Sequence, residues 1–215
     1  MEETLRYRQR YQLEKVPEGY SAAVHGSANF GLLALFFIGL LLAIPEWHGW
    51  YLVSLPAVWF IGSFVVWLLH RYPLHRPMPF ARYAYNIHAL QHHRYFTDKN
   101  PHVRTARELH IVLFPTWVIA GFCFGVLPVV LVALTWASSL GVALSVGSCC
   151  CLFFFAYELV HLCCHLRDGH PVTKIPYIGA MRRHHGLHHK PGHFACNFNI
   201  VWPVWDRIFG TIQKV

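Results

Sequence analysis

Three long apolar runs alternate with polar segments along the chain, and this alternation predicts helices that cross a membrane. The last and longest run, Leu109–Tyr157, has no Asp, Glu, Lys or Arg in 49 residues. About 20 helical residues cross a bilayer, so this run is long enough for two helices. A break is expected at Pro128 or at residues 138–141. We therefore expect an all-α integral membrane protein with four transmembrane helices, near residues 28–44, 50–70, 110–133 and 138–160.

Polar residues gather in three segments, which are expected to share one side of the membrane. Residues 1–27 form an N-terminal segment at the membrane surface and lack the pattern of a signal peptide. Residues 71–108 and 166–215 form a cytoplasmic helical cap on a membrane domain that covers 28–215. All 18 Lys and Arg lie in these three segments, and basic residues mark the cytoplasmic side. Both termini are thus expected in the cytoplasm, in a multi-pass protein of a bacterial inner membrane or the endoplasmic reticulum.

Composition supports the membrane interpretation. The chain is 55% hydrophobic and only 13% charged, about half the charged fraction of an ordinary soluble protein. Its net charge of +8 is explained by topology, with anionic lipid headgroups as a secondary partner, and we expect no binding of nucleic acid. The seven cysteines include no CxxC pair, which favours small buried residues over a disulfide framework.

Histidine is unusually frequent, with 17 residues against 10 acidic ones. Neutral imidazole is a good ligand for iron, zinc, copper and nickel. One metal ion seldom takes more than about six ligands, so a set of ten indicates two metal ions. Ten histidines have ligand-like spacing: His70 and His75, then His88, His92 and His93, then His161 and His165, and finally His185, His188 and His189.

Helical spacing places several of these side chains together. On a helix, His185, His188 and His189 share one face because they stand at i, i+3 and i+4. Pro73 should end a helix at or before Tyr72, so His70 is expected on the last turn of a membrane helix and His75 on the turn after it.

The order of these groups resembles that of the fatty acid hydroxylase superfamily. The motifs read HX4H, HX3HH, HX3H and HHX2HH, and they are followed by Asn197-Phe-Asn and by Trp205-Asp206-Arg-Ile-Phe-Gly-Thr211. The resemblance covers about residues 60–211. It departs from the usual HX2HH second motif, because Ala89 stands where a histidine is usual and His88 lies one residue earlier. An acidic residue often found shortly before the first motif is also replaced, by Val65-Val66-Trp67.

The resemblance implies an integral membrane di-iron enzyme that uses O2 and external electrons. The expected activity is hydroxylation of an alkyl C–H bond in a fatty acyl, sterol or related lipid. Zinc is an alternative occupant, because all-histidine ligation accepts it as readily as iron. Spans and cap account for all 215 residues, so the electron donor is expected to be a separate cytochrome b5, ferredoxin or reductase.

Three other polar residues are assigned roles. Glu158 is the only acidic residue of the last span, and an ionisable group in a membrane is a functional candidate. We expect it to support a histidine, with an ion pair to Arg167 or Arg71 as the alternative. Asn197 is expected either to support the metal site or to form a turn, and Asp206 to organise the C-terminal turn.

The remaining histidines are expected to have other roles. His184 points away from the face of His185 on a helix, so it should make hydrogen bonds, and His193 flanks the same cluster. The other five lack partners at ligand spacing: His25, His48, His102, His110 and His170.

Two alternative functions remain open at this point. A lipid desaturase would use the same motifs. A metal-binding or metal-transport membrane protein is less favoured, because a transporter would place ionisable ligands near the middle of its spans, whereas these histidines lie at span ends and in the cap.

Overall fold

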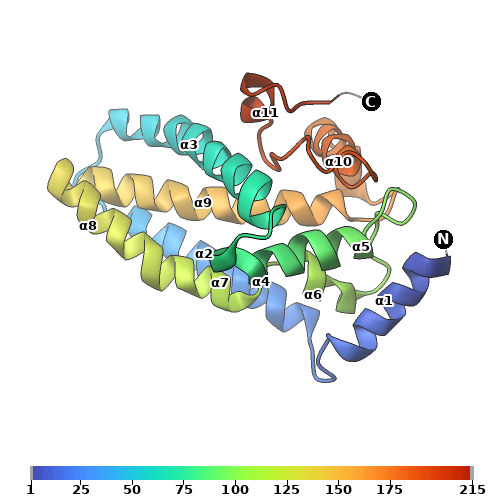
Figure 1. The fold of residues 1–215 in the computed structure, drawn as a ribbon. Helices are drawn as coiled ribbons and strands as arrows, with labels where there is room; N and C mark the ends of the chain where they lie inside the picture. The colour runs from blue at the N-terminus through green and yellow to red at the C-terminus, as the bar shows by residue number, and fades with distance from the viewer. Residues whose placement is uncertain (1, 214–215) are drawn as a thin grey trace. The chain divides into compact units, whose positions relative to one another are not determined.

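The computed structural model describes residues 2–213, and within this range it is all-helical without a β-strand (Figure 1). This confirms the predicted fold class. The α-helices are α1 (Glu2–Glu14), α2 (Ala22–Leu42), α3 (Ser54–Leu69), α4 (Arg82–Tyr85), α5 (His93–Tyr95), α6 (Leu109–Val112), α7 (Thr116–Gly121), α8 (Leu127–Ala137), α9 (Leu140–Cys164), α10 (Pro176–His188) and α11 (Val204–Ile208). Short 3-10 helices are η1 (Gly49–Val53), η3 (Pro79–Ala81), η5 (Ala106–Glu108) and η7 (Pro171–Lys174), and π-helical turns are η2 (His70–Leu74), η4 (Asn86–His92) and η6 (Phe122–Val126).

Four helical stretches are long and apolar enough to cross a membrane, as expected. They contain α2, then η1 with α3 and η2, then α7 to α8, and finally α9. The third stretch runs through Pro128 to Ala137, so the break falls at Ser138 and Ser139. Pro128 is accommodated because it stands in the first turn of α8, directly after a π-helical turn. The bounds of the four candidate membrane spans are Ala22–Leu42, Gly49–Leu74, Thr116–Ala137 and Leu140–Cys164.

The chain forms two compact units, and it passes from one to the other at the start of α2, within α3, between α6 and α7, and within α9. One unit contains the residues up to Ala22, Ser63–Leu113 and the residues from Leu159 onward. The other contains Ala23–Gly62 and Phe114–Glu158. Of the described residues, 2–22 therefore group with the histidine-bearing segments.

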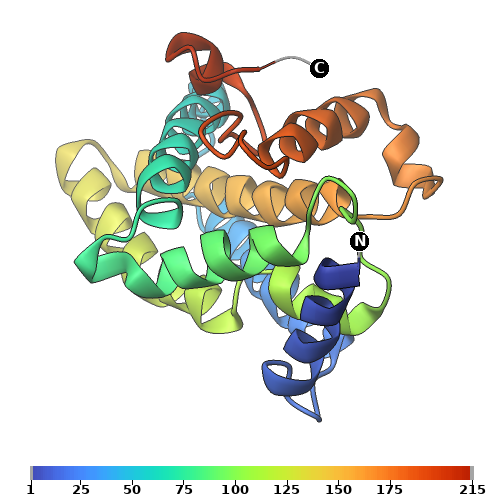
Figure 2. The same ribbon diagram turned by 45° about the vertical axis from the view of Figure 1, so that its right-hand side comes forward.

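An aromatic side chain of α1 and an aliphatic one just after the helix pack into the first unit. Tyr11 and Val16 are buried in a cluster with Tyr95, Phe96, Ile111 and Val112. The Tyr11 and Tyr95 rings meet edge to face with centroids 5.3 Å apart. Figure 2 shows α1, in dark blue, beside the green segment that follows α5. The N-terminal helix is thus part of the histidine-bearing unit.

The second unit contains two clusters of buried apolar side chains. Leu33, Ile119 and Cys123 form one cluster. Ile44, Tyr51 and Leu144 form the other. The first cluster joins α2 to α7 and η6, and the second joins the end of α2 to η1 and α9.

Gly141 marks a close approach between α9 and Tyr51. A Cβ atom at this position would overlap the Tyr51 hydroxyl and lie 2.9 Å from its Cζ atom. The Tyr51 ring is itself buried, so it has little room to move. Overpacking of this kind typically costs about 1–3 kcal/mol.

We predict that Gly141→Ala lowers the thermal stability of the detergent-purified protein by an amount in that range. Gly31→Ala is the matched control, because a Cβ at Gly31 meets nothing within 4 Å and Ala favours a helix. Melting curves followed by circular dichroism would measure both. Equal melting temperatures for Gly141→Ala and the wild type would contradict the predicted contact.

Candidate metal centre

Nine of the ten predicted ligands lie in two groups. Within each group, every histidine has one ring nitrogen that lies within 4.8 Å of those of the other members. The first group is His70, His75, His88, His93 and His188. The second is His92, His165, His185 and His189. The tenth, His161, lies beside the second group, with its ring centroid 5.0 Å from those of His92 and His185. All ten belong to the first compact unit.

Two π-helical turns assemble the first group. An α-helix turns by about 100° per residue, so residues five apart would point about 140° away from each other. A π-turn has i→i+5 hydrogen bonds, which bring residues five apart onto one side. The turn η2 does this for His70 and His75, and η4 does it for His88 and His93. The second motif, HX3HH, is one residue longer than the usual HX2HH. The π-turn compensates for the extra residue, so His88 still lies in the first group.

The α-helix α3 ends at Leu69, before Tyr72 as predicted, but helical structure extends two residues beyond Tyr72. The helical turn continues through Pro73 to Leu74 as a π-turn, and His75 follows directly after it. A proline cannot donate the hydrogen bond of an α-helix at its position, and a π-turn is a recognised way to accommodate such a disruption. His75 therefore stays next to His70, and the two ring centroids are 5.1 Å apart.

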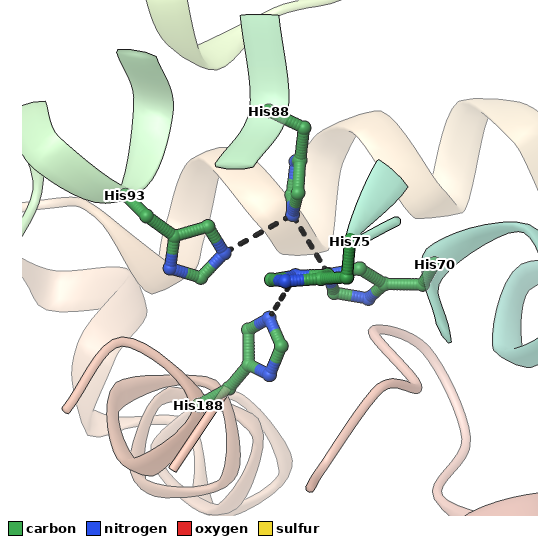
Figure 3. Close-up of side chains that lie close together, drawn as sticks. All are labelled: His70, His75, His88, His93 and His188. Carbon is green, nitrogen blue, oxygen red and sulfur yellow. Dashed lines mark hydrogen bonds between the residues drawn. The ribbon is translucent and has the colours of Figure 1, made fainter. Parts of the chain in front are cut away.

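Figure 3 shows the first group converging from separate parts of the chain. His88 Nε2 lies 2.8 Å from His70 Nε2 and 3.1 Å from His93 Nε2. His75 Nε2 lies 3.0 Å from His188 Nε2. The last residue of α10 thus faces side chains carried by the two π-turns and by α5.

The second group forms where α9 ends and α10 passes. His185 Nε2 lies 3.2 Å from His165 Nε2 and 3.0 Å from His189 Nε2. The His185–His189 contact reflects their i, i+4 spacing on α10, as expected from the sequence. His92 completes the group from the opposite end of η4, and its ring centroid is 4.9 Å from that of His189.

Backbone carbonyl groups hold five of these rings by their Nδ1 atoms. A carbonyl can only accept, so each of these Nδ1 atoms must carry the proton and Nε2 must carry a lone pair. Carbonyl partners of this kind fix the tautomer and the orientation of metal-binding histidines. The pairs are His70 with Phe198, His92 with Ile111 at 3.0 Å, His165 with Pro101 at 2.8 Å, His188 with Cys196 at 2.7 Å and His189 with Phe96 at 2.7 Å.

The Nε2 atoms that converge have too few protons to bond to one another. In the second group, the lone pairs of His165 and His189 both face His185 Nε2, which has at most one proton to donate. His92 Nε2 is buried and has no hydrogen-bond partner. Converging lone pairs repel unless a cation lies among them. Two nitrogens bound to one ion at about 2.0–2.1 Å would lie roughly 2.9–3.4 Å apart, which agrees with the 2.8–3.2 Å observed. Each of the two groups could therefore hold a metal ion.

Burial also keeps these imidazoles neutral, as metal binding requires. Burial lowers the pKa of His75 to about 4. It also lowers the pKa of His92 to about 4, although the Ile111 carbonyl acts in the opposite direction. Burial first, and neighbouring imidazoles second, lower the pKa of His88, His93, His165, His185 and His188.

Asp206 organises the C-terminal segment that supports the first group, in line with its expected role. Its Oδ1 accepts from the backbone N–H of Phe198 at 2.9 Å and from the Thr211 hydroxyl at 2.7 Å. Its Oδ2 accepts from the backbone N–H of Asn199 at 2.8 Å and faces His184 Nε2 at 3.1 Å. Burial alone would raise the pKa of Asp206, but these hydrogen bonds hold it below its usual value. His184 thus makes a hydrogen bond at the back of α10, as predicted.

Asn197 is placed in the scaffold around the metal centre. It adopts a left-handed backbone conformation with φ of 54°, which asparagine tolerates better than most residues. Its side-chain amide donates to the carbonyls of His184 and Gln213, and its Oδ1 accepts from the Gln213 backbone N–H. Asn197 was expected either to support the metal site or to form a turn, and these contacts agree with the turn.

Glu158 has different partners from those expected. Its Oε1 accepts from Asn29 Nδ2 at 3.1 Å and from the backbone N–H of Phe114 at 3.0 Å. Phe114 lies between α6 and α7, where its N–H has no helical partner, so the carboxylate satisfies a backbone donor. The expected contacts with a histidine, Arg71 or Arg167 are not among its hydrogen bonds or ion pairs. Its role is therefore within the second compact unit.

The histidines expected to have other roles lie outside the two groups. His193 Nδ1 faces the Gln213 side chain, and His102 Nε2 lies 3.1 Å from Asp168. His25 pairs with the Phe114 carbonyl, and His110 with the Tyr11 hydroxyl at 3.3 Å. His170 caps η7, and His48 is exposed beside Glu46.

Two features near the second group were not predicted. Arg8 and Glu108 form a buried ion pair beneath the loop after α5. Nothing in the sequence pairs these two residues, which are 100 positions apart. A cavity of about 100 Å³ also borders the group, lined by Pro101, His102, Cys164, His165, Arg182, His185, Gly186 and His189.

Comparison with known proteins gives the family. A model of the fatty acid hydroxylase family matches residues 55–211, which is more than half of the chain. This protein therefore belongs to the fatty acid hydroxylase family, whose members are oxidoreductases. Searches of curated proteins and of solved structures gave no match.

Proposed function

We propose that this protein is a membrane-bound di-iron oxygenase that hydroxylates an alkyl C–H bond of a lipid. The observation that carries the proposal is the pair of histidine groups, with Nδ1 atoms bound to carbonyls and Nε2 lone pairs converging. The family match supports oxidation of a lipid, and the four apolar helices agree with a substrate in the bilayer. The lipid could be a fatty acid, a sterol or a related molecule.

The overall reaction would consume one O2, two electrons and two protons, and would yield an alcohol and one water. Two bound iron ions would supply the redox chemistry that activates O2, which no side chain provides. The first ion would be held by His70, His75, His88, His93 and His188, and the second by His92, His161, His165, His185 and His189. The electrons would come from a separate cytochrome b5, ferredoxin or reductase.

The chain itself would position the metals and exclude water. Every histidine of the second group is at most 2% exposed, so solvent has little access to the converging nitrogens. His70 and His161 lie in the last turns of two candidate spans. An acyl chain that lies along these spans would bring a C–H bond close to the ligands without leaving the bilayer.

Lipid desaturation on the same histidine groups is the second candidate. The family match and the ligand set support both reactions equally, because both begin with attack on an unactivated C–H bond. A non-enzymatic metal carrier is less favoured, since the ligands are pinned by carbonyls and so are arranged for a fixed site.

The membrane orientation we propose places both termini in the cytoplasm. It rests on the 18 basic residues, all of which lie in the N-terminal segment, the 71–108 segment or the 166–215 segment. We predict that a reporter active only in the cytoplasm is active when fused to either terminus. The same reporter inserted at Trp47 should be inactive. Activity at one terminus alone would refute an even number of spans.

Two iron ions should bind per chain when the protein is expressed with added iron and purified in detergent. His188→Ala removes a proposed ligand of the first ion, so it should lower the metal content and abolish lipid oxidation. His48→Ala should keep both ions, because His48 is exposed and distant in sequence from the motifs. Elemental analysis checks each protein. Fewer than two ions in the wild type would count against the di-metal proposal.

Isotope labelling identifies the reaction. Cells that express the wild type would be supplied with 18O2, and their lipids compared with those of cells that express His188→Ala. A hydroxylase should add one 18O atom to a lipid in the wild-type cells only. A desaturase would yield an unlabelled lipid that is two hydrogens lighter. A hydroxylated product without label, or product formation without O2, would refute an oxygenase.

A further inference from the structure

We propose that Arg8, on the N-terminal helix α1, is a positioning residue for the second histidine group. Arg8 lies outside residues 55–211, which the family model matches. The proposal rests on the proposed function, because it requires that the histidine groups hold metal.

The two histidine groups obtain their carbonyl partners from two different segments. For the second group, Phe96 accepts from His189, Pro101 from His165 and Ile111 from His92. The neighbouring His161 pairs with the Val112 backbone. All four carbonyls come from residues 96–112. For the first group, the carbonyls of Cys196 and Phe198 come from the C-terminal segment that Asp206 organises.

Arg8 packs against the 96–112 segment and bonds to residues near its middle and its end. Only 4% of Arg8 is exposed. Its guanidinium donates to the carbonyls of Asn100 at 3.4 Å and His102 at 3.0 Å, on either side of Pro101. It also stacks on Tyr95 and Phe96, with its Cζ atom 4.6 Å and 5.4 Å from the ring centroids. One side chain therefore holds the chain on both sides of the Pro101 carbonyl, which binds His165, and packs on the ring of Phe96, whose carbonyl binds His189.

Glu108 completes this support. Its Oε2 accepts hydrogen bonds from the Arg8 guanidinium and from the backbone N–H of Arg104, the latter at 2.6 Å. The Arg104 side chain reaches back to the Asn100 side chain at 2.8 Å, which closes the loop between residues 100 and 108. Glu108 stands directly before α6, the helix that carries Ile111 and Val112. The Arg8–Glu108 ion pair thus connects the part of the segment that carries the Phe96 and Pro101 carbonyls to the part that carries the Ile111 carbonyl.

This arrangement gives Arg8 a specific effect on metal binding. A carbonyl that accepts from Nδ1 sets the direction of the Nε2 lone pair, because the imidazole ring is rigid. If the 96–112 segment shifts, the lone pairs of His92, His165 and His189 turn away from their common point. The first group should be unaffected, since its carbonyls depend on Asp206. A buried ion pair often adds little to stability compared with apolar residues of similar size, so precise placement of the carbonyls is the better explanation for this one.

The test compares metal binding by Arg8 variants and by a control on the same helix. The full chain would be loaded with Co²⁺ in detergent, and both ions would be titrated with a chelator while the visible absorption of Co²⁺ is recorded. We expect Arg8→Met to weaken one of the two ions by about 10–100-fold, the usual effect of removing support from a metal ligand. We expect Arg8→Lys to give an intermediate loss. Arg10→Met is the control, because Arg10 is exposed on α1, and it should bind both ions as the wild type does.

A second variant guards against misfolding from a buried unpaired carboxylate. Arg8→Met combined with Glu108→Gln leaves no unpaired charge, and Gln can still accept from the Arg104 N–H. It should fold and should also bind one of the two ions more weakly than the wild type does. Asp206→Asn should weaken the other ion instead, because it disturbs the carbonyls of the first group.

Double variants identify which ion is weakened. In the Arg8→Met background, His165→Ala should remove the weakened ion and keep the tightly bound one, whereas His188→Ala should remove the tightly bound one. Parallel weakening of both ions by Arg8→Met would show a general role in folding and would overturn the proposal. Unchanged binding of both ions would overturn it as well. A wild type that binds no Co²⁺ or iron would instead refute the metal site itself, and the positioning role with it.

Discussion

The structure depends on one constraint, which is that many neutral imidazoles must be buried together with their Nε2 lone pairs directed at common points. Buried polar groups need partners, and a ring nitrogen without one is costly. Backbone carbonyls solve half of this problem by accepting from Nδ1, as Phe96 does for His189 and Cys196 does for His188. The other half would be met by the metal ions that we propose, which the Nε2 atoms could bind. The carbonyl-bearing segments are therefore as much part of the metal centre as the histidines.

These segments need support of their own, because irregular chain does not hold its carbonyls in place. The C-terminal segment is held by the Asp206 carboxylate, which accepts from the backbone N–H groups of Phe198 and Asn199. The segment after α5 is held by the Arg8–Glu108 pair. In both cases a fully or almost fully buried charged group, stabilised by several hydrogen bonds, is placed behind the histidines. A charge there is tolerated because it makes several charge-assisted hydrogen bonds.

The π-helical turns show how the motif spacing is turned into geometry. Spacings of HX4H and HX3HH would direct residues five apart to different sides of an α-helix. The turns η2 and η4 bring His70 with His75, and His88 with His93, to the same side. Because η4 also presents His92 to the second group, one helical segment supplies ligands to both groups. The longer second motif is therefore compatible with the same centre.

The sequence alone was enough to predict the membrane class, the four helical spans and the residues of the histidine clusters. These depend on local properties: apolar length, charge, and i, i+4 spacing on helices such as α10. The family resemblance followed from the order of the same motifs and was confirmed. Only the tertiary structure decided how the histidines divide into two groups, since that depends on π-turns and on chain crossings that no local pattern encodes. It also decided that Glu158 binds Asn29 and the Phe114 N–H, and that Arg8 meets Glu108. Such contacts join residues tens of positions apart, and which buried charge meets which backbone donor is determined by packing of the whole chain.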